Sequence, residues 1–339
     1  MLRLLADLGD PQRAFRAVHV VGSNGKTSTT LMTAALLETA GLRTGATISP
    51  HIRDWSERIQ VGGSNADLER ALARVRPHAA GATQFEVLIA ASFAEFAAAG
   101  VEVAVVEAGL GGRLDATNVL DAEVVVLTNV ALEHIDVLGN TREKIAKEKL
   151  GVVSRGALVV LGEPEWEGPA RAAGAREVVV ATGSNRALAA AAAAGFLGRS
   201  VDPRGADSVV VPGRLEQRAE RPLEIWDGAH NAAGVAYLLA QLPDRRFTIV
   251  ASILADKDAG EMLKELAAVA EMIVVTRSQN PRALPAEDLA QLARSSFPHV
   301  EVEPEPAAAV ARARALAGPD GAVLVTGSLY LLAELSLDA

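Results

Sequence analysis

Residues 17–28 read AVHVVGSNGKTS, in which a β-branched run leads into a glycine-containing turn and then into a helical pattern. The run Ala17–Val21 predicts a strand, and Thr27–Ala40 predicts a helix that ends at Gly41. In a strand–loop–helix unit of this kind, backbone N–H groups of the loop and of the first helical turn can bind phosphate. The stretch therefore predicts an α/β fold built around a phosphate-binding loop.

The loop carries the residue types that nucleotide binding needs. Lys26 would neutralise the β- and γ-phosphate oxygens, and Thr27 or Ser28 would reach Mg²⁺. The spacing departs from the general P-loop pattern, whose first glycine would fall at Val20. An ordinary glycine turn before a helix is the alternative. We expect phosphate binding, and the candidate nucleotide-binding residues of the loop are Gly22, Ser23, Asn24, Gly25, Lys26, Thr27 and Ser28.

The composition limits the classes of protein to which the chain can belong. Half of its 339 residues are hydrophobic, which suffices for a sizeable core, and a net charge of -9 argues against nucleic-acid binding. The absence of cysteine excludes disulfides, thiolate zinc sites and thiol catalysis. No apolar run is long enough to cross a membrane, and the first residues, MLRLLADLGDPQR, are too short and too charged for a secretory signal. We expect a cytoplasmic protein that binds neither nucleic acid nor membranes.

Strand-like and helix-like runs alternate along the chain, which is typical of a doubly wound α/β sheet. Residues 199–212, rich in Gly, Pro, Asp and Ser, interrupt the alternation and predict a linker. The alternation then resumes, with strand patterns at Leu223–Trp226, Phe247–Ala251, Met272–Thr276 and Ala322–Thr326. The sequence predicts a P-loop domain with a doubly wound, mainly parallel sheet over residues 1–211, and a smaller Rossmann-like α/β domain over residues 212–339.

Further motifs follow the loop in a fixed order. They are TISPH at 47–51, ERI at 57–59, TQFE at 83–86, EAGLGGRLDATN at 107–118, TN at 128–129, EH at 133–134, EKLG at 148–151, PGRLE at 212–216, DGAHN at 227–231, DKD at 256–258 and GSLY at 327–330. Together with the loop, this series resembles the dihydrofolate synthase/folylpolyglutamate synthase family of the Mur ligase superfamily. Because the motifs run from residue 19 to residue 330, the resemblance covers nearly the whole chain.

The resemblance implies an ATP-dependent ligase that joins L-glutamate to dihydropteroate, to folylpolyglutamate or to both. The substrate carboxylate would attack the γ-phosphate of ATP, giving an acyl phosphate and ADP, and the amine of glutamate would then attack the acyl carbon. The expected partners are ATP, a pteroate or folate, L-glutamate and Mg²⁺ at two sites, and we expect a monomer. Three alternatives stay open: a Mur-type ligase for another carboxylate, a P-loop kinase or ATPase, and a binding protein with a degenerate site.

The resemblance assigns Ser49, Glu107 and His134 to a metal site, and Lys26, Glu107, His134 and Lys149 to catalysis. The sequence supports the location, because Glu107 ends one apolar strand pattern and His134 follows another. In open α/β sheets, ligands bind at the carboxyl ends of the strands. Without the resemblance, an isolated histidine is more often a structural residue.

Lys149 allows two interpretations. The segment Thr141–Leu150 predicts a helix, with Asn140 and Glu143 placed as in a capping box, and Ile145 and Lys149 share one of its faces. If that face is apolar, burial lowers the pKa of Lys149, and its neutral amine can take up carbon dioxide. The resemblance implies such a carbamylated lysine. The sequence alone favours a surface lysine at a helix C-terminus.

The candidate residues for the pterin ring are Thr83, Phe85, Asp115 and Ala116, and these roles rest on the resemblance. They are physically reasonable, because an aromatic ring can stack on a flat heterocycle and a carboxylate can accept hydrogen bonds from ring N–H groups. Taken alone, Phe85 is better explained by core packing.

The resemblance also places residues of the second half of the chain at the nucleotide. It puts Asn185, Asp227 and His230 near ATP and Arg214 on its phosphates, where a cation would stabilise the transferring phosphoryl group. Further candidates for binding the acyl phosphate and the incoming glutamate are Lys257, Ser278 and Arg282.

Overall fold

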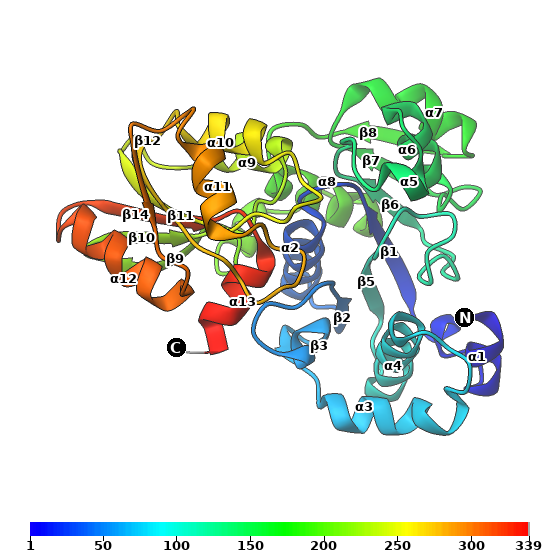
Figure 1. The fold of residues 1–339 in the computed structure, drawn as a ribbon. Helices are drawn as coiled ribbons and strands as arrows, with labels where there is room; N and C mark the ends of the chain where they lie inside the picture. Colours follow the sequence, from blue (N-terminus) through cyan, green and yellow to red (C-terminus); the bar gives the residue numbers. More distant parts are fainter. Residues whose placement is uncertain (338–339) are drawn as a thin grey trace. The chain divides into compact units, whose positions relative to one another are not determined.

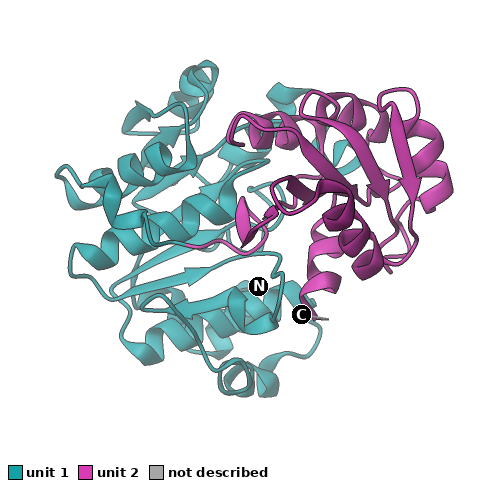
Figure 2. Ribbon diagram, turned by 90° about the vertical axis from the view of Figure 1, so that its left-hand side faces the viewer, with its two compact units in different colours: residues 1–209 teal, residues 210–339 magenta. Residues whose placement is uncertain are grey.

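The computed structural model describes residues 1–337, and the chain divides into two compact units. Unit 1 comprises residues 1–209, and unit 2 begins at Val210 (Figure 2). The linker composition predicts a boundary after residue 211, and the division lies after residue 209. None of the helices within residues 1–337 has the length and apolarity needed to cross a membrane.

Unit 1 is built on an eight-stranded sheet (Figure 1). Its strands are β1 (Arg16–Val21), β2 (Thr44–Thr47), β3 (Ile59–Val61), β4 (Ser64–Asn65), β5 (Val103–Glu107), β6 (Val124–Leu127), β7 (Leu158–Leu161) and β8 (Glu177–Val180). They lie in the order β4-β3-β2-β5-β1-β6-β7-β8. In this order, all neighbouring pairs from β2 to β8 are parallel, whereas β3 is antiparallel to β2 and β4 is antiparallel to β3. The β1 strand therefore lies between β5 and β6, and the carboxyl ends of all three strands lie at the same edge of the sheet.

The helices of unit 1 cover both faces of this sheet. They are α1 (Leu2–Asp7), α2 (Lys26–Thr39), α3 (Leu68–Val75), α4 (Gln84–Ala99), α5 (Ile135–Leu138), α6 (Arg142–Leu150), α7 (Glu167–Ala172) and α8 (Asn185–Leu197). Short 3₁₀ turns occupy Pro11–Arg13, Trp55–Arg58, Arg76–His78, Pro164–Trp166 and Pro203–Ala206. Side-chain caps fix where several helices begin: the Thr83 hydroxyl accepts from Glu86 N at the start of α4, and Ser184 Oγ accepts from Ala187 N at the start of α8.

The core of unit 1 explains why these segments fold as they do. The β-branched runs of β1, β5 and β6 are almost entirely buried, as expected for strands covered on both faces. Phe93 and Phe96 of α4 are fully buried and pack against the ring of Phe15 at 5.7 and 5.8 Å between centroids. The alanine-rich α8 packs beside α2, since small side chains allow the two helices to approach closely.

Unit 2 is a six-stranded sheet in the order β13-β12-β11-β14-β10-β9. Its strands are β9 (Glu216–Glu220), β10 (Leu223–Trp226), β11 (Phe247–Ala251), β12 (Ala270–Val275), β13 (His299–Val302) and β14 (Ala322–Thr326). All pairs are parallel except the β9–β10 hairpin. The helices are α9 (Ala232–Leu239), α10 (Ala259–Leu266), α11 (Ala286–Ala293), α12 (Pro306–Ala317) and α13 (Leu329–Leu337).

The predicted fold class is confirmed, because unit 1 is a mainly parallel α/β unit with a P-loop and unit 2 is a smaller α/β unit. One local prediction is wrong. The N-cap of α6 is Thr141, whose hydroxyl accepts from Lys144 N, so Asn140 and Glu143 form no capping box there. The predicted linker, residues 199–212, contains the boundary between the two units, and part of it packs on α2: a Cβ built on Gly205 would lie 3.1 Å from Leu36 Cδ2.

Candidate functional site at the strand ends

The phosphate-loop candidate connects the end of β1 to the start of α2, as the sequence predicts. Gly22 has φ +148°, and a Cβ at this position would lie 1.8 Å from Thr128 Oγ1. Gly25, with φ +80°, is the N-cap of α2, and a Cβ there would lie 2.4 Å from Asn185 Oδ1. Glycine is therefore required at both positions. The predicted residue Asn185, at the start of α8, lies directly against the loop.

The segment after β6 holds the loop in place. Asn129 accepts hydrogen bonds through its carbonyl from Ser23 N at 3.0 Å and through Oδ1 from Asn24 N at 2.8 Å. The neighbouring Thr128 hydroxyl donates to the Asn24 carbonyl at 2.7 Å. The sequence identifies Thr128-Asn129 as a motif but predicts no role for it. The structure shows that it supports the backbone of the loop.

Lys26 begins α2 and turns back over the loop. Its Nζ donates to the carbonyls of Gly22 at 3.1 Å and Ser23 at 3.2 Å. A positive charge is thus fixed at a helix N-terminus, where backbone N–H groups already favour anions. This combination suits the phosphates of a nucleotide.

Glu107 ends β5 beside this loop, and its side chain is only 2% exposed. Its carboxylate accepts from the Thr27 hydroxyl at 3.1 and 3.0 Å and from Ser49 N at 3.1 Å. The predicted metal residues Ser49 and Glu107 are therefore brought together through the Ser49 backbone N–H, and the Thr27 hydroxyl places another oxygen beside the carboxylate. Carboxylate and hydroxyl oxygens fit Mg²⁺. Within residues 1–337, no three His, Asp or Glu side chains converge as a metal site, so an ion here would also draw on other oxygens, such as those of phosphate.

Arg58 lies close to the same carboxylate and was missed by sequence reasoning. Burial lowers the pKa of the Arg58 guanidinium, and the charge of Glu107 opposes that shift. Arg58 Nε donates to His51 Nδ1 at 2.9 Å, and its guanidinium lies 4.7 Å from the centroid of the Trp55 ring. A partly buried cation beside Glu107 adds to the anion-binding character of this edge.

Lys149 is a buried residue, so the surface-lysine interpretation is wrong. Its side chain is 1% exposed, and its Nζ donates to the Gly22 carbonyl at 2.8 Å and to Glu133 Oε1 at 2.8 Å. Sequence reasoning gave Glu133 no role, because only the folded chain shows that its carboxylate reaches Lys149. Burial lowers the pKa of Lys149 to about 8, although Glu133 opposes the shift. Burial also disfavours the ionised form of Glu133, but the charges of Lys149 and Lys26 outweigh it and lower the pKa of Glu133.

Most of the charged groups described above line a small cavity of about 30 Å³ at the carboxyl ends of β1 and β5. It is lined by Gly22, Lys26, Ala108, Gly109, Leu110, Gly111, Glu133, His134 and Lys149. His134 reaches it from a left-handed backbone conformation, with φ +45°, at the N-cap of α5. The cavity thus joins three of the four predicted catalytic residues, and Glu107 immediately precedes the lining residue Ala108.

Two of the pterin candidates, Asp115 and Ala116, lie in the loop that follows β5, and a third, Phe85 of α4, packs on it. Phe85 packs on Gly109, where an added Cβ would lie 2.5 Å from Phe85 Cζ. Asp115 Oδ2 accepts from Leu110 N at 2.8 Å, and Ala116 packs against the core. Thr83, in contrast, uses its hydroxyl to cap α4. Phe85 and Asp115 therefore contact adjacent residues of one loop, on which a flat ring could bind.

The unit 2 candidates form a separate group around Gly228. Asp227 accepts from Leu215 N and Ala229 N, both at 2.8 Å, and His230 Nδ1 lies 2.9 Å from the Gly228 carbonyl. A Cβ built on Gly228 would lie 2.5 Å from Arg214 Nη1, so this guanidinium packs on the same turn. Burial raises the pKa of Asp227, against the opposing charge of Arg214.

A second set of unit 2 candidates lies after β11 and β12. Asp256 pairs with Lys257 at 3.3 Å and with Arg282 at 3.8 Å. Arg282 Nη2 also donates to the Tyr330 hydroxyl at 3.4 Å. Ser278 is 1% exposed, and its Oγ has no hydrogen-bond partner within residues 1–337. These groups are two cations and a buried hydroxyl, each of which can donate a hydrogen bond to a carboxylate.

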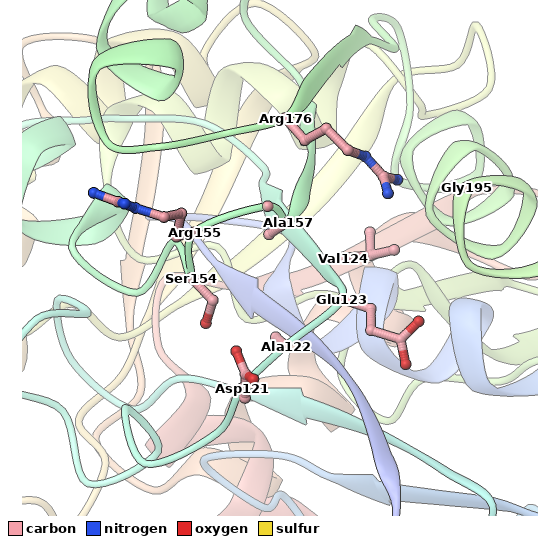
Figure 3. Close-up of a pocket in the computed structure, with 10 residues that line it drawn as sticks. Asp121, Ala122, Glu123, Val124, Ser154, Arg155, Ala157, Arg176 and Gly195 are labelled. Atoms are coloured by element: carbon pink, nitrogen blue, oxygen red, sulfur yellow. The ribbon is translucent and has the colours of Figure 1, made fainter.

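A larger cavity, of about 200 Å³, lies at the opposite ends of the unit 1 strands. It is lined by Asp121, Ala122, Glu123, Val124, Ser154, Arg155, Gly156, Ala157, Arg176 and Gly195, none of which is a predicted site residue. Arg155 and Arg176 extend in opposite directions (Figure 3), and the charge of Arg176 is among the causes that lower the pKa of Glu123. The two cations therefore do not converge on an anion site.

The buried Lys149 predicts a pH dependence of stability. Its pKa is about 8 in the folded state against 10.5 for an ordinary lysine, so between these values the unfolded chain binds more protons and stability rises with pH. In buffer free of carbon dioxide, the wild type should gain roughly 3 kcal/mol relative to Lys149→Met between pH 8 and pH 10.5. Denaturant unfolding across this range measures the difference. Lys264→Met, at an exposed position, is the control, and a constant difference between wild type and Lys149→Met would contradict the prediction.

The whole chain matches known proteins. Family models for the Mur ligase middle domain and for the Mur ligase glutamate ligase domain match residues 20–196 and 213–329. The dihydrofolate synthase/folylpolyglutamate synthase of Mycobacterium tuberculosis is 34% identical over 86% of this chain and 76% of its own. A structure of E. coli FolC in complex with DHPP and ADP has a TM-score of 0.87, is 28% identical and covers 99% of this chain and 91% of its own. A further similar structure is that of the bifunctional folylpolyglutamate synthase/dihydrofolate synthase of Yersinia pestis, complexed with AMPPNP and Mn ion. It has a TM-score of 0.88 and is 26% identical, and the match covers 99% of this chain and 92% of the Yersinia pestis chain. The chain belongs to the dihydrofolate synthase/folylpolyglutamate synthase family of Mur ligases.

Proposed function

We propose that this chain joins L-glutamate to dihydropteroate, to folylpolyglutamate or to both, at the expense of ATP. The observation that carries the proposal is the meeting of the loop at Gly22, the side chains of Lys26 and Lys149 and the carboxylate of Glu107 at one edge of the unit 1 sheet. The E. coli relative that holds DHPP and ADP supports a pteroate-type acceptor and a nucleotide in such an enzyme.

In the first step, the acceptor carboxylate attacks the γ-phosphate of ATP, which yields an acyl phosphate and ADP. Lys26 would offset the charge on the transferring phosphoryl group, and the N–H groups that begin α2 would bind the phosphates. Asn185 lies against Gly25 and would contact the nucleotide from α8. Arg214, Asp227 and His230, which group around Gly228 in unit 2, are proposed as further nucleotide-binding residues.

A divalent cation, Mg²⁺, fits the oxygen donors around Glu107. Ser49, Glu107 and His134 would hold one ion, and Thr27 or Ser28 a second that also contacts phosphate. When bound, such ions offset negative charge on the transferring phosphoryl group. The manganese and AMPPNP in the Yersinia pestis relative support a metal–nucleotide pair in this family.

Lys149 is proposed to be carbamylated. Its lowered pKa leaves part of the amine neutral near pH 8, and the neutral nitrogen can add to the carbon of carbon dioxide and lose a proton. The resulting carbamate would be an anion beside Lys26 and the carbonyl of Gly22. It would provide a further oxygen ligand on the side of the cavity that His134 lines.

In the second step, the amine of glutamate attacks the acyl carbon and phosphate leaves. Lys257, Ser278 and Arg282 are the proposed groups for the glutamate carboxylates and the acyl phosphate. Thr83, Phe85, Asp115 and Ala116 would bind the pterin. These roles require only one copy of the chain, which is why we propose a monomer.

The reaction itself is tested by measuring ADP release. Wild type with ATP, Mg²⁺ and glutamate should release ADP only when dihydropteroate or a reduced folate is present, and the preferred acceptor identifies the substrate. Lys26→Ala should lower the rate about 100-fold or more, because it removes a charge that stabilises the transferring group. Lys264→Ala, an exposed position in unit 2, is the control. ADP release without glutamate or acceptor would instead indicate a kinase or an ATPase.

The metal assignment predicts a specific defect in Glu107→Gln. Loss of the carboxylate charge should raise the Mg²⁺ concentration that gives half-maximal ADP release about ten-fold or more. Titration of Mg²⁺ at saturating ATP and acceptor measures it. Glu69→Gln changes an exposed carboxylate and should follow the wild-type curve. If both variants follow that curve, Glu107 holds no ion.

The carbamate is tested with ¹³C-labelled bicarbonate. The wild type should show a carbamate carbon signal by NMR that Lys149→Met lacks, and Lys144→Met, which changes an exposed lysine of the same helix, should retain it. A wild-type spectrum without this signal would remove the carbamate from the proposal.

A further inference from the structure

A buried chain of hydrogen bonds connects the central strand of unit 1 to the loop that carries the pterin candidates. His19 lies in β1, between β5 and β6, and its side chain is 0% exposed. Its Nε2 lies 2.8 Å from Thr117 Oγ1, and Thr117 Oγ1 lies 2.5 Å from Asp115 Oδ1. Neither His19 nor Thr117 has a role in the two reaction steps proposed above.

The direction of each hydrogen bond follows from the groups at the two ends. A carboxylate can only accept, so the Thr117 hydroxyl donates to Asp115 and must accept from the Nε2–H of His19. Burial lowers the pKa of His19 to about 4, although the charge of Asp115 opposes the shift, and the imidazole is neutral at neutral pH. Its other nitrogen, Nδ1, is buried without a partner within residues 1–337, as the unprotonated atom of this tautomer.

Asp115 is held from two sides. Oδ1 accepts from the Thr117 hydroxyl and from Thr117 N at 2.9 Å, and Oδ2 accepts from Leu110 N at 2.8 Å. A carboxylate has about four acceptor positions, so one direction on Oδ2 is still available. The Asp115 side chain is only partly buried, and Phe85 packs on Gly109, next to Leu110. A ligand at this loop would meet a fixed acceptor atom beside an aromatic ring.

We propose that His19 and Thr117 are positioning residues that orient the Asp115 carboxylate to accept a hydrogen bond from a ring N–H of the acceptor substrate. This inference rests on the proposed function and deepens it, because it extends substrate recognition to a strand that also leads into the phosphate loop. The hydroxyl of Thr117 fixes which oxygen of Asp115 is occupied, and the imidazole of His19 fixes the direction of that hydroxyl.

Steady-state kinetics with dihydropteroate and with a reduced folate test the inference. Thr117→Val keeps the shape of the side chain and removes the hydroxyl, so it should raise the KM for the acceptor about ten-fold while the KM for ATP stays within about two-fold. Thr117→Ser restores the hydroxyl and should restore the acceptor KM. Thr33→Val removes another fully buried hydroxyl, in α2, and is the control for a loss that is only structural.

The histidine gives an independent measurement if Thr117→Val does not fold. His19→Leu should raise the acceptor KM, and His19→Gln, whose amide can donate at a similar reach, should reverse most of the change. In the double variant with Thr117→Val, His19→Leu should not raise the acceptor KM further, because the hydrogen bonds from His19 to Asp115 are already interrupted at Thr117.

The outcomes separate this inference from the proposed function. A wild type that shows no acceptor-dependent ADP release overturns the proposed function, and the inference with it. A wild type with normal kinetics and a Thr117→Val variant with an unchanged acceptor KM, or with both KM values raised equally, overturns the inference alone. Failure of both Thr117→Ser and His19→Gln to rescue would also overturn it.

Discussion

In the unmodified chain, the buried amino group of Lys149 is the constraint on which the site depends. A charge removed from water must be paired, and here the partners are the carbonyl of Gly22 and the carboxylate of Glu133. These contacts tie α6 to the phosphate loop and to the segment after β6, three parts of the chain that are distant in sequence. The small cavity lies among these parts and is lined by Gly22, Glu133, His134 and Lys149.

A parallel sheet places such groups together without any local sequence signal. Because β5, β1 and β6 are neighbours and run in the same direction, their carboxyl ends bring Glu107, the loop at Gly22 and Asn129 to one edge. Each strand is an apolar run followed directly by polar residues. The apolar part builds the core, and the first polar residues beyond it build the site.

The sequence predicts the central parts of both units better than their edges. The strands at Ala17–Val21 and Phe247–Ala251 are found almost as predicted, because buried strands are continuous apolar runs. In contrast, β9 and β13 were not predicted. They are the two edge strands of unit 2, with the sequences EQRAE and HVEV, and charged residues at an edge hide the strand pattern.

The site likewise has parts that the sequence predicts and parts that it does not. The phosphate loop could be predicted because its residues are consecutive. The burial of Lys149 and its pairing with Glu133 could not, because the helix that carries Lys149 has charged residues on several sides and its apolar surroundings come from other elements. The approach of Asn185 to Gly25 likewise depends on the packing of α8 against α2. Short-range patterns define the loop, and only the folded chain defines its neighbours.

The position of β1 also affects the order of events during synthesis. The strand and its loop leave the ribosome before their hydrogen-bonding partners β5 and β6, which end at Glu107 and Leu127. Lys149, whose Nζ donates to the Gly22 carbonyl in the loop, comes later still. Long-range pairing of this kind is slow, and its early members stay exposed until their partners emerge. The nascent chain therefore contains the phosphate-loop sequence long before it can form a phosphate-binding loop.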